Sequence, residues 1–144
     1  MTDSRIRYLV DNSVWARLPT NVEVVQSLRA LVLRHRPADI LVCPPIVAEI
    51  GYSARSGEEH DRIIDRLKAF AECAEVPRSG DVLDIQNRLW HKGLVRSVGA
   101  MDAVIAAYAL ANHATVLHYD RDFEHVGSVM PEFRHAWVVP RGSL

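Results

Sequence analysis

Short apolar runs alternate along this sequence with longer segments of helical periodicity. The expected strands span residues 5–10, 40–43, 115–119 and 136–139. A strand that stays apolar along its length is buried on both faces, which is typical of parallel sheets covered by helices. The alternation of such strands with helices therefore predicts an α/β fold with a parallel central sheet.

Five segments have the apolar spacing and the end signals of helices. They span residues 21–36, 45–55, 58–74, 81–92 and 102–112. Pro37 and Gly93 end two of these helices, and Gly57 is interpreted as a break before the third. The last segment is apolar on nearly all sides, which is typical of a central, buried helix. With 144 residues and no internal repeat or linker, the chain is expected to form one domain, 1–144.

The composition excludes several classes of protein. No apolar run approaches the ~18 residues of a membrane span, and the N-terminus lacks the layout of a signal peptide, so a cytoplasmic protein is expected. Cys43 and Cys73 are too few and too isolated for a zinc site or a disulfide framework. A net charge of -1 excludes a polybasic arm, and it neither requires nor excludes a nucleic-acid partner.

Acidic residues follow two of the expected strands. Asp11 comes directly after the first strand and Asp120 directly after the third, with Asp122 two positions further on. A single Asp after a strand is most often a turn or cap residue. Because ligands of open α/β sheets bind beyond the carboxyl ends of the strands, two such acids indicate a functional site at that edge.

Two further carboxylates lie where helices are expected to be apolar. Glu49 shares a helical face with Ile46 and Tyr52, and Asp102 opens the most apolar helix. Each has a plain structural explanation, since Asp102 is favourable at a helix N-terminus and Glu49 could reach solvent at the edge of its helix. These explanations stay open for either residue alone. A desolvated carboxylate is nevertheless strongly disfavoured unless it is paired or binds a metal.

The four acids point to a hard cation. Only Asp120 has a basic sequence neighbour, Arg121. Oxygen donors without a His or Cys pattern suit Mg²⁺ or Mn²⁺ better than zinc, and the seven histidines are scattered without a ligand pattern. Such an ion activates water and offsets charge on a leaving oxygen, so these residues indicate metal-assisted hydrolysis of a phosphodiester.

Ser13 lies two positions after Asp11, and two roles are open for it. Its hydroxyl could bind the Asp11 carboxylate or a metal-bound water and so hold a ligand in place. It could equally cap a short helix that runs through residues 15–17. The two roles are compatible with one another.

Together these residues resemble the PIN-domain nucleases and, more narrowly, the VapC toxins of bacterial VapBC toxin–antitoxin modules. The resemblance runs from about residue 6 to 139 and rests on VDNSVW at residues 10–15, AEI at 48–50, MDAVIAA at 101–107 and YDRDF at 119–123. Each motif is weak alone, but all four acids in this order make a specific signal. Two departures are the late position of the first Asp and Tyr119, where many relatives have Thr or Ser.

The resemblance implies a three-layer α/β/α PIN-like domain with Mg²⁺- or Mn²⁺-dependent endoribonuclease activity. As a toxin it would cut transfer or ribosomal RNA and arrest translation. The catalytic and metal-binding roles would fall on Asp11, Glu49, Asp102 and Asp120. Ser13 would support them, and Asp122 could anchor the last loop or share the ligand role of Asp120. A homodimer and a VapB antitoxin whose C-terminal segment lies over the active site are also implied.

The main alternative is a PIN-like module that binds RNA or protein and has lost catalysis. Intact acids at all four places count against it, because crowded carboxylates are unfavourable and give a binding module no advantage. RNA cleavage that requires a divalent ion distinguishes the two interpretations.

Overall fold

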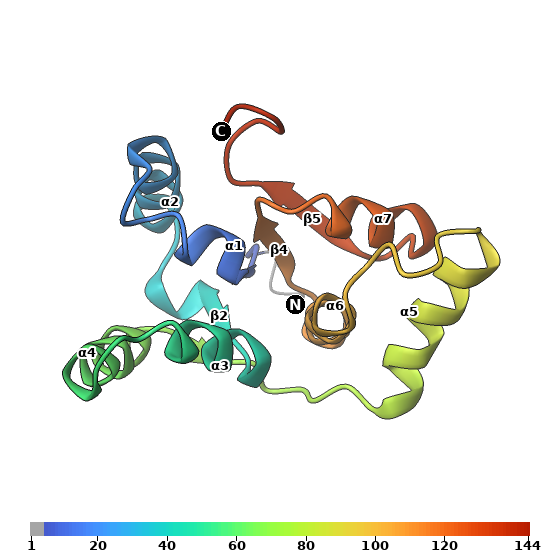
Figure 1. The fold of residues 1–144 in the computed structure, drawn as a ribbon, viewed down its shortest axis with the longest axis horizontal. Coiled ribbons are helices and arrows are strands. Elements are labelled where there is room, and N and C mark those ends of the chain that lie inside the picture. Colours follow the sequence, from blue (N-terminus) through green and yellow to red (C-terminus); the bar gives the residue numbers. More distant parts are fainter. Residues whose placement is uncertain (1–4) are drawn as a thin grey trace.

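The computed structural model describes residues 5–144, and its centre is a five-stranded sheet in which every neighbouring pair of strands is parallel (Figure 1). The strands are β1 (Tyr8–Val10), β2 (Ile40–Val42), β3 (Ala71–Glu72), β4 (Thr115–His118) and β5 (Arg134–Trp137). Their order in space is β3-β2-β1-β4-β5, so β1 is the central strand. The predicted parallel sheet is confirmed. The first four residues of the predicted domain 1–144 lie outside the described part.

Helices cover both faces of this sheet. They are α1 (Asn12–Trp15), α2 (Val22–Arg34), α3 (Pro44–Tyr52), α4 (Gly57–Leu67), α5 (Ser79–His91), α6 (Ala100–Ala111), α7 (Asp122–Val129) and the 3-10 helix η1 (Pro37–Asp39). Side chains of α1 and α2 pack on one face, and side chains of α3, α5, α6 and α7 pack on the other. The expected three-layer α/β/α architecture is therefore confirmed. Over residues 5–144, no helix has both the length and the apolar character needed to cross a membrane.

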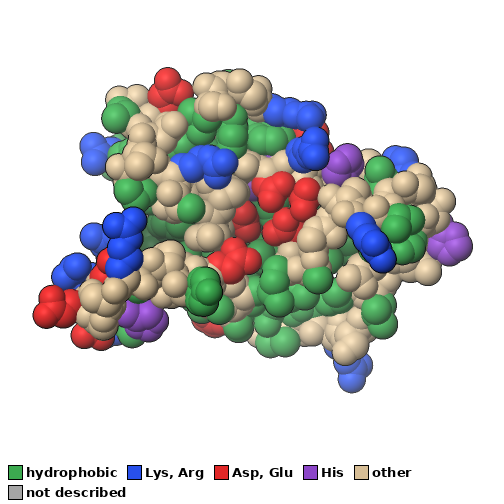
Figure 2. Space-filling model, viewed as in Figure 1, with side chains coloured by type: hydrophobic (Ala, Val, Ile, Leu, Met, Phe, Trp, Pro, Cys, Tyr) green, Lys and Arg blue, Asp and Glu red, His purple; other side chains and the backbone are tan. Residues whose placement is uncertain are grey.

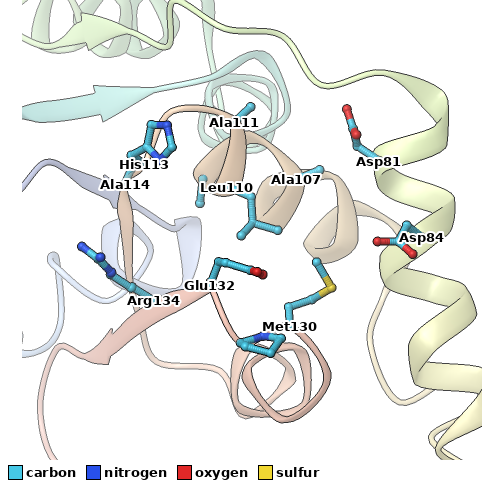
Figure 3. Close-up of a pocket in the computed structure, with 12 residues that line it drawn as sticks. Asp81, Asp84, Ala107, Leu110, Ala111, His113, Ala114, Met130, Glu132 and Arg134 are labelled. Atoms are coloured by element: carbon cyan, nitrogen blue, oxygen red, sulfur yellow. The ribbon is translucent and has the colours of Figure 1, made fainter.

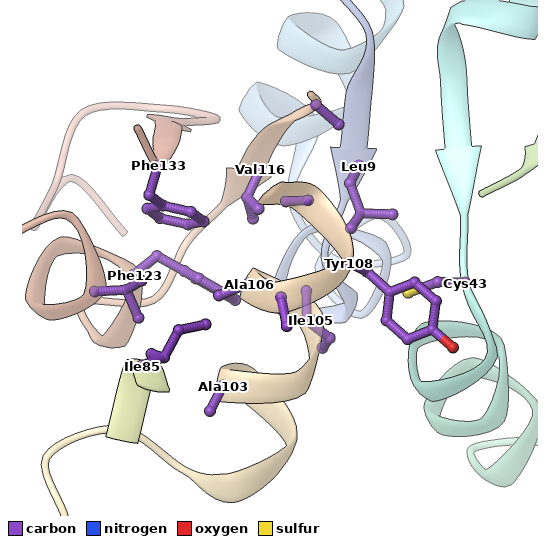
Figure 4. Packing of buried hydrophobic residues seen from close by; sticks show 14 of the residues in the cluster. Leu9, Cys43, Ile85, Ala103, Ile105, Ala106, Tyr108, Val116, Phe123 and Phe133 are labelled. Atoms are coloured by element: carbon purple, nitrogen blue, oxygen red, sulfur yellow. The ribbon is translucent and has the colours of Figure 1, made fainter. Parts of the chain in front are cut away.

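Successive residues of the central strands point into opposite layers. Leu9 and Val116 belong to the core cluster around α6, whereas Val10 and Leu117 belong to the cluster around α1 and α2. Figure 4 shows α6 packed between the sheet on one side and α5 and α7 on the other. Ile105 of α6 is fully buried. The helix is thus central, as predicted.

The prediction of one helix over residues 58–74 is wrong. Helix α4 begins at Gly57, which opens the helix rather than breaking the chain, and it ends well before residue 74. Residues 71–72 instead form β3, which pairs with β2. Phe70, which lies within the predicted helical range, packs its ring against Trp15, with the ring centroids 5.4 Å apart. A strand of two residues has no periodicity of its own, so the helical pattern extended over it.

Two further elements differ from the prediction. Helix α7 has no counterpart among the predicted segments, because only Phe123 and Val126 of its residues are buried and the apolar period is short. Strand β5 begins at Arg134 rather than at residue 136, and β1 begins at Tyr8 rather than at residue 5. Arg134 and His135 are polar, so the apolar pattern left out the start of β5.

The cap of α2 gives a test of local stability. The side chain of Asn21 accepts the backbone N–H of Val24 at 3.1 Å. We expect Asn21→Ala to lower the free energy of unfolding by about 1 kcal/mol, because this N–H of the first turn loses its acceptor. Urea denaturation measures the change, with the exposed neighbour Thr20→Ala as the control expected within ~0.5 kcal/mol of the parent. Equal losses in both variants would remove the cap as the cause.

Candidate functional site

The candidate site forms where two neighbouring strands end. β1 and β4 pair in parallel, so Asp11 and Asp120, which follow them, leave the sheet at the same edge. The Ser13 hydroxyl oxygen accepts the backbone N–H of Tyr119 at 2.9 Å. This contact joins the loop after β1 to the loop after β4 and keeps the two acids close to one another.

Asp11 is buried, and only one of its two carboxylate oxygens is satisfied. Asp11 as a whole residue is only 4% exposed. Its Oδ2 accepts the backbone N–H of Ser13 at 2.9 Å. Its Oδ1 is buried and finds no hydrogen-bond partner among the described residues. Burial raises the pKa of Asp11 above its usual value, the hydroxyl and N–H of Ser13 oppose this rise, and the charge of Asp120 adds to it.

Ser13 does not cap α1, although the sequence left that role open. Asp11 is the cap residue, and Ser13 lies in the first turn of a helix that ends at Trp15. The Ser13 side chain instead lies between the Asp11 carboxyl group and the backbone of Tyr119. A side chain in this place can hold Asp11 and the loop after β4 in one arrangement.

Three aspartates from different segments meet beside Asp11. Asp102 lies in the first turn of α6, Asp120 in the loop after β4, and Asp122 at the start of α7. One carboxylate oxygen of each lies within 4.8 Å of the others. Asp120 Oδ1 accepts the N–H of Asp122 at 2.9 Å, and Asp122 Oδ2 accepts the N–H of Gly99 at 3.1 Å. Asp122 therefore lies inside the acidic group and also joins α7 to the start of α6.

The crowding of these carboxylates is clearest at Asp102. Its pKa is raised to about 9, first by burial and then by its hydrogen bond with Asp122 and the charges of Asp11 and Asp120. Without a cation, the carboxyl group of Asp102 retains its proton at neutral pH. Carboxylates whose ionisation is so disfavoured, and which lie at a ligand-binding edge, are typical of functional sites.

Glu49 lies at the outer edge of the acidic group. α3 places it near Asp11, outside the tight set of three aspartates, and it stays partly exposed. Burial and then the charge of Asp11 raise the pKa of Glu49, while a hydrogen bond from the Asn12 side chain opposes the rise. Asn12 was not predicted as a site residue, although a polar residue directly after the strand-end acid was a signal for it.

The acidic group fits a divalent cation. Figure 2 shows Asp and Glu side chains gathered near the middle of one face, with Lys and Arg side chains placed around them. Within residues 6–144, no Lys or Arg forms an ion pair with Asp11, Glu49, Asp102 or Asp120. The unpaired Oδ1 of Asp11 and the grouped carboxylates offer only oxygen, the donor that Mg²⁺ and Mn²⁺ prefer.

A separate cavity of about 590 Å³ lies between α5, α6 and the segment that leads into β5. Figure 3 shows Asp81 and Asp84 on one wall and Glu132 and Arg134 on another. His113, which precedes β4, also lines it, so the cavity opens at the amino ends of the strands. None of the candidate site acids lines this cavity. Since ligands of open α/β sheets bind at the carboxyl ends, the acidic group is the better candidate site.

Two histidines that showed no pattern in the sequence meet behind Asp120. His118, the last residue of β4, is completely buried, and its Nε2 lies 2.8 Å from Nδ1 of His135 in β5. Its Nδ1 accepts the backbone N–H of Asp120 at 3.1 Å. Burial, followed by the charge of His135, lowers the pKa of His118 to about 3. The signal for this residue was a polar side chain inside an apolar strand, two positions before the acid.

Comparison with known proteins identifies the family. The profile of the PIN domain matches residues 8–129. The chain is 33% identical to ribonuclease VapC18 of Mycobacterium tuberculosis over 144 residues, which cover 95% of this chain and 98% of that protein. It is 34% identical to ribonuclease VapC21 of the same organism, with 95% and 97% covered. The chain is a PIN-domain protein of the VapC family.

Solved VapBC complexes share the fold of this PIN domain. The match to VapBC-1 of nontypeable Haemophilus influenzae has a TM-score of 0.72 at 17% identity and covers 92% of this chain and 98% of that chain. The match to VapBC2 of Rickettsia felis, bound to a promoter DNA fragment, has a TM-score of 0.69 at 16% identity with the same coverage. These structures support the α/β/α arrangement described above.

Proposed function

We propose that this PIN domain is a Mg²⁺-dependent endoribonuclease toxin, active also with Mn²⁺, that hydrolyses phosphodiester bonds of transfer or ribosomal RNA and so inhibits translation. The observation that carries the proposal is the group of acids at the carboxyl edge of the sheet, with the unpaired, buried Oδ1 of Asp11 beside it. The ribonuclease names of VapC18 and VapC21 support the reaction class. Crowded carboxylates lower stability, so their presence is best explained by function.

The proposal gives the metal-binding and catalytic roles to Asp11, Glu49, Asp102 and Asp120. When bound, the ion supplies Lewis-acid chemistry, which activates water toward phosphorus and offsets charge on the leaving oxygen. The paired ends of β1 and β4 place the carboxylates of Asp11 and Asp120 at the same edge of the sheet. The Ser13 hydroxyl joins the two loops that carry them. A carboxylate oxygen of Glu49, partly exposed and with its pKa raised, is suited to accept the proton of the attacking water.

The requirement for a divalent ion tests the reaction. We expect the purified protein to cleave RNA with Mg²⁺ or Mn²⁺ and to lose this activity when EDTA is added. Undiminished cleavage in EDTA would contradict the proposal. RNA binding without cleavage under any divalent ion would instead support the inactive binding module. Mapping of RNA ends after induced expression, compared with Asp102→Ala, identifies the target, and an absence of new ends in transfer and ribosomal RNA would exclude that target class.

The proposal extends to a VapB-type antitoxin and a homodimer. Solved structures that share this fold include VapBC2 from Rickettsia felis and VapBC from Salmonella typhimurium, each described as bound to DNA. We expect a small protein encoded beside this gene to co-purify with the PIN domain and to suppress its RNA cleavage. Light scattering of the purified PIN domain is expected to give twice the 16.2 kDa mass of one chain.

Asp122→Asn decides whether Asp122 shares the ligand role. The amide oxygen of Asn can still accept the N–H of Gly99, so the join between α7 and α6 is kept while the charge is lost. We expect Mg²⁺ affinity to fall about 10-fold, as for residues that hold or supplement metal ligands. Glu124→Gln is the control, because Glu124 is acidic in the same first turn of α7 but contacts Trp137 and Arg141. Equal affinities for Mg²⁺ in the two variants would leave Asp122 with an anchoring role only.

A further inference from the structure

We infer that His118, held by His135, is a positioning residue that fixes the backbone of Asp120 for metal binding. The inference rests on the proposed function, because it concerns how a proposed metal ligand is held. It adds to the site two residues from neighbouring strands, one at the end of β4 and one in β5.

A continuous set of hydrogen bonds connects β5 to the acidic group. His135 Nδ1 lies 2.8 Å from His118 Nε2, and His118 Nδ1 accepts the N–H of Asp120 at 3.1 Å. The side chain of Asp120 in turn accepts the N–H of Asp122 at 2.9 Å. Asp120 is therefore held at its backbone by His118 and at its carboxylate by the start of α7.

Only one proton arrangement satisfies these contacts. A ring nitrogen that accepts an N–H carries no proton, so His118 Nδ1 is bare and its Nε2 carries the hydrogen. That hydrogen is donated to Nδ1 of His135, which places the proton of His135 on its own Nε2. Both rings are thus neutral, and the two hydrogen bonds run in one direction, from the Asp120 N–H to His118 and from His118 to His135.

Packing prevents the His118 ring from leaving this orientation. The ring is completely buried, and its centroid lies 5.0 Å from that of Phe123 and 4.8 Å from that of Trp137. On the far side of His135, a Cβ placed on Gly127 would lie 3.2 Å from Nε2 of the His135 ring. The close approach of α7 to His135 therefore depends on glycine at position 127.

The hydrogen bond to His118 matters because it holds the backbone N–H of Asp120, whereas the backbone carbonyl of Asp120 accepts the N–H of Phe123 at 3.3 Å. The N–H of Asp120 would be left without this acceptor if the ring were removed, and an unsatisfied backbone group near the core is unfavourable. The loop would shift to find another partner, and the carboxylate would move with it. Metal ligands lose affinity when the groups that orient them are removed, typically by ~10- to 100-fold.

Two substitutions at position 118 separate positioning from packing. The side-chain oxygen of Asn is as far from its Cα as Nδ1 of histidine, so His118→Asn can still accept the N–H of Asp120. His118→Gln places its amide toward His135 and offers no acceptor at the Nδ1 position. Both variants lose the buried ring, so we expect similar losses of thermal stability in the metal-free protein.

Isothermal titration with Mn²⁺ is the deciding measurement. We expect the Kd of His118→Gln to rise about 10-fold above that of the parent and the Kd of His118→Asn to stay within about 3-fold. Equal Kd values for the two variants would overturn the inference, because the acceptor would then be irrelevant. A parent protein that binds no Mn²⁺ would overturn the proposed function itself, so the two failures are distinguishable.

Nuclear magnetic resonance tests the contact without any metal. In the parent protein we expect nitrogen shifts that place the His118 proton on Nε2, and slow hydrogen exchange at the Asp120 amide. Exchange at this amide is expected to be faster in His118→Gln than in His118→Asn. A proton on Nδ1 of His118, or equal amide exchange in the two variants, would overturn the inference.

Discussion

Asp11→Asn is expected to abolish RNA cleavage and also to raise the free energy of unfolding of the metal-free protein. Asn retains an oxygen that can accept the N–H of Ser13, but it removes a buried charge whose Oδ1 has no partner among the described residues. Removal of a group that only orients a metal ligand lowers metal affinity or activity by ~10- to 100-fold. Loss of the ligand itself is therefore expected to lower the cleavage rate about 1,000-fold or more. The free energy of unfolding rises because burial and repulsion from Asp120 both disfavour the charge. Cleavage rates at saturating Mg²⁺ and urea denaturation in EDTA measure the two effects.

Asp39→Asn is the matched control for this variant. Asp39 and Asp11 are both 4% exposed, but Asp39 accepts the N–H of Arg36 and forms an ion pair with its side chain at 3.7 Å. Asp39→Asn is therefore expected to lower stability and leave RNA cleavage unchanged. If Asp11→Asn destabilised the protein as Asp39→Asn does, the charge of Asp11 would be compensated within the fold. If Asp11→Asn kept its activity, Asp11 would not belong to the catalytic group.

The second large effect is a fall in the stability of the metal-free protein as the pH rises. In the folded protein the pKa of Asp102 is about 9, against 3.8 for an ordinary Asp, so between these values the folded state holds a proton that the unfolded state has released. The free energy of unfolding therefore decreases with increasing pH across this window. Urea denaturation in EDTA at a series of pH values measures the slope. Asp102→Asn removes the group, and we expect it to flatten the curve.

Addition of Mn²⁺ or Mg²⁺ is expected to reverse this dependence. Carboxylates must be ionised to bind the ion, so the stabilisation by metal grows as the pH rises. The melting temperature of the parent protein should then increase with both pH and metal concentration, whereas that of Asp102→Asn should respond much less. A parent protein whose stability is unchanged by either ion at high pH would contradict the assignment of the acidic group as a metal site.

The central strands and the central helix were predictable because segments buried on both faces are apolar along their whole length. The strands around Leu9 and Val116 and the helix around Ile105 are apolar in the sequence because they are buried on both faces in the structure. The edge strand β3 and the helix α7 lack this pattern, because they are short and partly exposed. Their formation depends on pairing with β2 and packing on α5 and α6, which no local window contains.

The acids of the candidate site could be found from the sequence, but their geometry could not. Asp11 and Asp120 follow apolar strands, and that position alone predicts which edge they share. The place of Asp122 within the tight group depends on the start of α7, which the sequence did not indicate. The pairing of His118 with His135 depends on the register of β4 against β5, and register is a property of the folded sheet.

The hydroxyl contact between the loops after β1 and β4 links positions that are 106 residues apart. The ribosome releases the N-terminal segment first, so β1 has no β4 to pair with until the intervening residues and β4 itself have been synthesised. A growing polypeptide therefore exposes isolated aspartates and no assembled nuclease centre. RNA cleavage by this centre therefore cannot begin before β4 has been synthesised, which gives a partner protein time to bind the enzyme during its synthesis.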